Sequence, residues 1–125
     1  MNDALIRLLL ILVAAATVVS GLTQLFAPGL VLGVIGASTE PPSPHLFATV
    51  GMFMFITGAM FLQSLLARSA DRSIPLWIGI QKLLAALLVA LGVVRGIFGG
   101  LALAVAGFDL ASGVLALVFL ARLPR

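Results

Sequence analysis

The stretch "PLWIGIQKLLAALLVALG", Pro75–Gly92, decides the fold. It is almost wholly apolar, and as a helix rising about 1.5 Å per residue it nearly matches the thickness of the hydrocarbon core of a bilayer. It nevertheless carries Gln81 and Lys82 well inside its length. A lysine in hydrocarbon costs about 2.5–3.5 kcal/mol on insertion scales. The sequence therefore indicates a membrane-spanning helix in which Lys82 needs a partner.

The composition of the whole chain leads to the same class of protein. Of 125 residues, 62% are hydrophobic and 9% are charged, and the mean hydropathy is +1.30. A soluble domain has roughly 25% charged residues, so these charges are too few to build a polar surface. Residues 1–125 are predicted to form a single transmembrane domain. The net charge of +3 gives no indication of a nucleic-acid partner.

The counts of cysteine and histidine narrow the possible chemistry. The chain has no cysteine and one histidine. This excludes disulfides, thiolate catalysis and a zinc site with three or four nitrogen or sulfur ligands from this chain alone. A single histidine also excludes bis-histidine haem ligation within one chain. We predict no metal and no cofactor, and assign no enzymatic activity.

Four apolar runs are each long enough to cross a bilayer, which takes about 20 helical residues. Their sequences lack the alternation of barrel strands. The expected architecture is all-α, an integral membrane four-helix bundle with antiparallel up-and-down spans. A cleaved signal peptide is the alternative for the first run, but its apolar character continues to span length and favours an uncleaved span. The runs are Leu5–Phe26, Leu46–Ala67, Ile74–Val94 and Gly99–Leu120.

The connections between the runs differ in length. In the longest, Leu30–Ile35 is apolar but too short to span. We expect it to lie at the interface or to dip back over the mouth of the bundle. The alternative is a one-turn extension of the first helix beyond a proline kink. Before the third run, Ser73 is expected to cap the helix, with Pro75 in its first turn.

The distribution of arginine predicts orientation. Arginines near span ends are enriched on the cytoplasmic side of a membrane. With the N-terminus inside, only Arg95 lies on the opposite side. Both termini are therefore predicted to be cytoplasmic, and the loop with Glu40 and His45 external. The arginines on the predicted cytoplasmic side are Arg7, Arg68, Arg72, Arg122 and Arg125.

The expected partner of Lys82 is Asp109. The last two spans form a tight hairpin, and residues equally far from its turn at Arg95–Gly96 lie at equal depth. Lys82 and Asp109 satisfy that condition. Both also have small residues one turn away, such as Gly79 and Gly113, which mark helix contacts in membranes. In the alternative, Lys82 extends to the headgroups and Asp109 is neutral.

Further polar residues in the spans are candidates for lining a cavity with this pair. These are Thr17, Gln24, Gln81 and Ser112. Simple helix packing is the alternative, because Ser and Thr hydroxyls can bond to their own backbone. Close helix contacts are predicted at the Ala14/Gly21 face of the first span and the Gly51/Gly58 face of the second.

The layout resembles the DoxX-like and related small four-span membrane proteins of unknown function. The resemblance rests on "LFAP" at Leu25–Pro28, a Pro-rich loop, the His45–Gly51 entry to the second span and Arg68 at its end. It implies an accessory role in a membrane oxidoreductase assembly and a bacterial inner-membrane location. It carries over no catalytic residues.

Two functions are left open by the sequence. The first is a structural or accessory subunit that packs as a homo-oligomer or in a larger membrane complex, with lipid or quinone as its candidate ligand. The alternative is a small proton-coupled transporter that uses an intramembrane Lys82–Asp109 pair. A wet cavity that reaches Asp109 would favour transport, and a sealed pair would favour a structural role.

Overall fold

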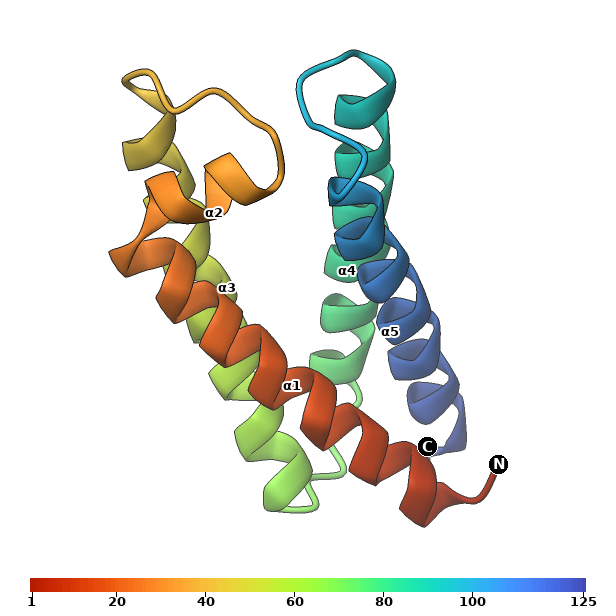
Figure 1. Ribbon diagram of the computed structural model, residues 1–125. Helices are drawn as coiled ribbons and strands as arrows, with labels where there is room; N and C mark the ends of the chain where they lie inside the picture. The colour runs from red at the N-terminus through yellow and green to blue at the C-terminus, as the bar shows by residue number, and fades with distance from the viewer.

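The computed structural model describes residues 1–125 and is entirely helical (Figure 1). Four of its helices are long and apolar enough to cross a membrane, and α2 is a short helix between the first two of them. The predicted all-α four-helix membrane bundle is therefore confirmed. The helices are α1 (Asp3–Phe26), α2 (Pro28–Val34), α3 (Ser43–Leu66), α4 (Ser73–Val94) and α5 (Ala102–Arg122).

The helices begin at somewhat different residues from those expected. α3 begins at Ser43 rather than Leu46, and α5 begins at Ala102 rather than Gly99. The predicted cap by Ser73 is wrong, because Ser73 is the first residue of α4. Its backbone N–H and its hydroxyl both donate to Oδ1 of Asp71, at 2.8 and 2.6 Å. These hydrogen bonds lower the pKa of the exposed Asp71 carboxyl below its usual value.

The short helix α2 is a separate element and not an extension of α1. The backbone leaves the helical conformation at Ala27, with φ −135° and ψ 57°, and Pro28 then begins α2. α2 packs on α3 and α1 with Leu32 buried, and runs toward the α4/α5 side (Figure 1). Beyond its end, the carbonyl of Ile35 accepts a 2.8 Å hydrogen bond from the N–H of Gly99. The α2 segment thus contacts the α4–α5 connection at this end of the bundle.

The four spans form two tightly packed pairs, α1 with α3 and α4 with α5. The α1–α3 crossing depends on two glycines whose backbones are in contact. A Cβ added at Gly21 would lie 2.5 Å from the Phe55 nitrogen, and one at Gly51 would lie 2.8 Å from the Gly21 oxygen. Ala14 and Gly58 are buried as well, so the predicted small-residue contact faces are confirmed.

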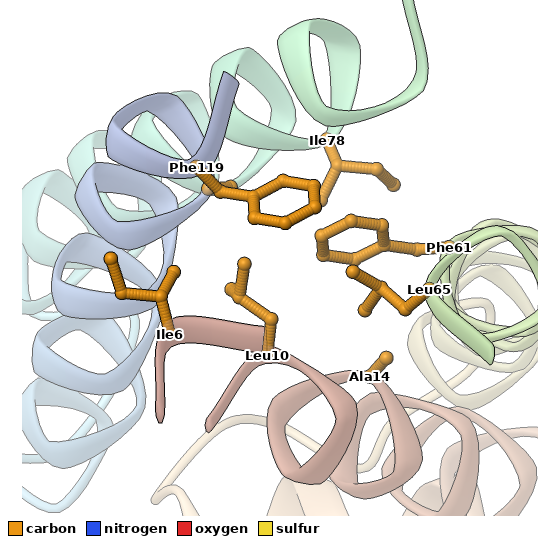
Figure 2. Close-up of a cluster of buried hydrophobic side chains, with 8 residues drawn as sticks. Ile6, Leu10, Ala14, Phe61, Leu65, Ile78 and Phe119 are labelled. Carbon is orange, nitrogen blue, oxygen red and sulfur yellow. The ribbon is translucent and has the colours of Figure 1, made fainter. Parts of the chain in front are cut away.

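The two pairs meet in a hydrophobic cluster near the end that carries both termini (Figures 1 and 2). Eight buried side chains from all four spans point toward one another there. Toward the α2 end, the ribbons of the two pairs separate (Figure 1). The cluster therefore fixes the pairs at one end and leaves the middle of the bundle to other contacts. Its members are Ile6, Leu10, Ala14, Phe61, Leu65, Ile78, Ala116 and Phe119.

Candidate functional site

A polar cluster in the middle of the bundle is centred on Lys82. The residue is only 7% exposed. Its Nζ lies 3.5 Å from Oδ1 of Asp109 on α5 and donates a 3.1 Å hydrogen bond to Oγ1 of Thr17 on α1. Sequence reasoning placed Lys82 and Asp109 at equal depth, and the structure brings them into contact. Thr17 adds a third span, so the cluster joins α4 and α5 to α1.

The Lys82 ammonium finds its hydrogen-bond acceptor, its counter-ion and an aromatic ring within the same chain. The Thr17 hydroxyl donates to the Val13 carbonyl at 2.9 Å, which leaves its oxygen free to accept from Lys82. The ring of Phe108 lies 5.3 Å from Nζ, within the range of a cation–π contact. The Lys82–Asp109 distance is longer than the 2.7–2.9 Å typical of a charge-assisted hydrogen bond. The ion pair is therefore a loose contact, and Thr17 provides the shorter one.

Small residues let the lysine stem pass between the helices. A Cβ added at Gly113 on α5 would lie 3.1 Å from the Cβ of Lys82. A Cβ added at Gly79 on α4 would lie 2.6 Å from the Leu117 side chain. Gly79 and Gly113 lie opposite one another, so α4 and α5 can approach closely one turn away from the ion pair.

The other predicted polar residues lie apart from Lys82. Nε2 of Gln24 donates to the Phe47 carbonyl at 3.0 Å and connects α1 to α3. Nε2 of Gln81 lies 3.3 Å from the Thr57 hydroxyl and connects α4 to α3 on an exposed face. The Ser112 hydroxyl donates to the carbonyl of Asp109 in its own helix. Of the four candidate cavity residues, only Thr17 joins the cluster.

Two residues that contact the predicted polar side chains were not identified from the sequence. Phe108 contacts Lys82, and its position directly before Asp109 was the available signal. Thr57 accepts from Gln81, but one threonine in an apolar run gives no indication of its partner.

A shallow apolar cavity of about 290 Å³ lies between α1 and α5 beside this cluster. Ser112 and Phe108 line it, and neither Lys82 nor Asp109 does. The polar atoms of the ion pair therefore face one another and Thr17 rather than this cavity. The remaining lining residues are Leu9, Leu12, Val13, Ala111 and Leu115.

These features define the chain as a small integral membrane protein with four apolar helices and a buried ion pair between them. No group of three or more His, Cys, Asp or Glu side chains is placed to hold a metal ion. No protein-family model, no curated protein and no solved structure matches the chain.

Proposed function

We propose that this protein is a structural or accessory membrane subunit, in the manner of the DoxX-like proteins that its layout resembles. The observation that carries the proposal is that the buried Lys82 side chain is paired entirely within its own chain. Lys82 contacts Asp109 and Thr17 of its own chain, so its polar atoms connect three spans. A satisfied charge between helices is suited to holding them in register.

The surface of the bundle supports association with other membrane components. In the most apolar stretch of α3 only 17% of the residues are buried by the rest of the chain, against 28% in each of the other three spans. Phe53, Ile56 and Met60 of α3 are all exposed. In a bilayer such a face is covered by lipid, by a second copy or by a larger complex, and α3 is the face we assign to packing with a partner.

The expected result of mild-detergent purification is an assembly larger than one chain. The tagged protein, taken from its native membrane, should run as a homo-oligomer or with a stoichiometric membrane partner. Native mass spectrometry measures the mass, and Ile56→Arg on the exposed α3 face should reduce it to that of the monomer. Leu87→Arg on the exposed face of α4 is the matched control and should leave the assembly intact. A wild-type protein that is monomeric under these conditions would contradict the proposal.

Proton-coupled transport is the second candidate, and one observation favours it. The Lys82–Asp109–Thr17 cluster lies between two helix pairs that contact one another sparsely, and the Asp109 side chain is 18% exposed. Protonation of Asp109 would remove its attraction for Lys82. Proteoliposomes with an internal pH dye distinguish the two functions. Proton flux that is lost in Asp109→Asn would favour the transporter, and its absence in wild-type protein would favour the accessory role.

We further propose that the protein lies in a bacterial inner membrane with both termini in the cytoplasm. The arginine distribution supports this orientation, since Arg95 is the single arginine at the α4–α5 end.

Cysteine labelling tests this topology directly. The chain has no cysteine, so each introduced cysteine is unique. Glu40→Cys should react with a membrane-impermeant maleimide on intact spheroplasts, because its loop is expected outside. Ala70→Cys should react only after the membrane is opened. Labelling of the Glu40→Cys variant solely from the cytoplasmic side would reverse the orientation.

A further inference from the structure

A second cavity, of about 570 Å³, lies at the end of the bundle that carries the chain termini. Three arginines from different parts of the chain line it: Arg7 in α1, Arg68 just beyond α3 and Arg122 at the end of α5. Its apolar wall includes Leu8, Ile11 and Phe119. The cavity thus combines basic groups at a span end with an apolar surface that continues into the membrane.

The three arginines differ in how far their charges are already offset. Arg122 donates to Asp3 at 2.9 Å and to the Met1 carbonyl, so a carboxylate offsets its charge. Arg7 donates to the Leu65 carbonyl at 2.8 Å, and its guanidinium lies 5.3 Å from the centre of the Phe119 ring. Neither of these partners is an anion. Arg68 makes no side-chain hydrogen bond or ion pair with the rest of the chain.

The Arg7 guanidinium is held in place by these contacts, and the exposed Arg68 side chain lines the same cavity. Guanidinium groups bind phosphate oxygens in a bidentate manner. Span ends lie at the level of the lipid headgroups, where basic pockets between helices bind anionic lipid headgroups. Leu8 and Ile11 follow Arg7 in α1, and they are exposed and half-buried respectively. They form an apolar track, a strip of surface that leads from Arg7 into the hydrocarbon.

We propose that this cavity binds an anionic phospholipid, with its phosphodiester at Arg7 and Arg68 and an acyl chain along Leu8 and Ile11. The positive charge at the cavity exceeds the single negative charge of Asp3. An anionic lipid therefore binds in preference to a zwitterionic lipid with the same acyl chains. The site is separate from the Lys82 cluster and does not depend on which function that cluster serves.

The test uses delipidated protein in detergent and native mass spectrometry, with phosphatidylglycerol and phosphatidylcholine of identical chains as probes. Phosphatidylglycerol should bind the wild-type protein at least about fivefold more tightly. Because one arginine near the headgroups contributes about 1 kcal/mol, Arg68→Gln should weaken phosphatidylglycerol binding about fivefold. The Arg7→Gln/Arg68→Gln double variant should weaken it about 25-fold. Phosphatidylcholine binding should fall less, because its choline cation already offsets the charge of its phosphodiester.

Arg95→Gln is the matched control, because Arg95 is exposed at the opposite end of the bundle. It should leave phosphatidylglycerol binding unchanged. Arg7→Gln also removes the hydrogen bond to Leu65, so the fold of each variant is checked by circular dichroism. If the double variant does not fold, Arg68→Gln alone still tests the site, because the Arg68 side chain makes no hydrogen bond or ion pair that the fold would lose.

Three outcomes would overturn the proposal. Equal affinity for the two lipids would show that the cavity does not select negative charge. An equal loss in Arg95→Gln would show a general charge effect. Competition by inorganic phosphate at the affinity of the lipid would show a site for a free anion, in which the apolar track has no part.

Discussion

Lys82→Met and Asp109→Leu, made singly, should each lower the free energy of unfolding by about 3–5 kcal/mol, since either change leaves the other charge buried without its counter-ion. The Lys82→Met/Asp109→Leu double variant should recover much of that loss. Replacement of a buried ion pair by apolar residues of similar volume is often neutral. The measurement is a double-mutant cycle on unfolding in mixed detergent micelles.

The structure also provides a control for this cycle. Gln81 is adjacent to Lys82 in sequence but lies on an exposed face, where its side chain reaches Thr57. Gln81→Leu should therefore change the stability little. Additive losses in Lys82→Met and Asp109→Leu, without recovery in the double variant, would mean that the two side chains do not interact. The ion pair would then have no role in the register of α4 and α5.

Gly21→Ala should lower the free energy of unfolding by about 2–3 kcal/mol, through overpacking at the α1–α3 crossing. The added Cβ would lie 2.5 Å from the Phe55 nitrogen and 2.8 Å from the Gly51 oxygen. Both are backbone atoms, so no side-chain rotation relieves the clash and the helices must move apart. Gly58→Ala should cost less, since its Cβ would meet the Thr17 side chain at 3.1 Å.

Gly107→Ala is the matched control on α5, because nothing lies within 4 Å of its added Cβ. It should be neutral or stabilising by up to about 1 kcal/mol from helix propensity. Thermal unfolding in one detergent, followed by circular dichroism, ranks the three variants. A Gly21→Ala protein as stable as Gly107→Ala would show that the α1–α3 contact contributes little.

The sequence predicts the spans and the Lys82–Asp109 contact because both follow from simple constraints. Apolar length defines a span, and a tight turn at Arg95–Gly96 fixes which depths of α4 and α5 coincide. A helix at α2 was considered only as an extension of the first span, since its seven residues are too few for a periodic pattern to identify a separate helix. The expected Ser73 cap was wrong because the neighbouring Asp71 carboxylate accepts from the Ser73 backbone and hydroxyl.

The sequence named the candidate cavity residues but did not determine which partner each side chain contacts. Gln24 lies two turns beyond Thr17 on α1, hence on the same face but about 10 Å further along the helix. It therefore meets the Phe47 carbonyl instead of Lys82. Gln81 shares the depth of Lys82 but points about 100° away around α4. Thr17 was a candidate cavity residue, but its contact with Lys82 could not be predicted. The tight turn that identified Asp109 relates depths within α4 and α5 only and does not relate α1 to α4.

The pairing of α1 with α3 and of α4 with α5 also leads us to expect a particular order of assembly. Each pair is a hairpin of helices consecutive among the spans, with its own glycine contacts. Each can therefore form in the bilayer as soon as its second helix has inserted. We expect docking of the two hairpins to be a later and weaker step. It is made by the hydrophobic cluster and by polar contacts that include Lys82 with Thr17, Gln81 with Thr57, Arg122 with Asp3, and Ile35 with Gly99. We therefore expect the first large opening of the folded protein to be a lateral separation of two intact halves, which the residues between Leu66 and Ser73 connect.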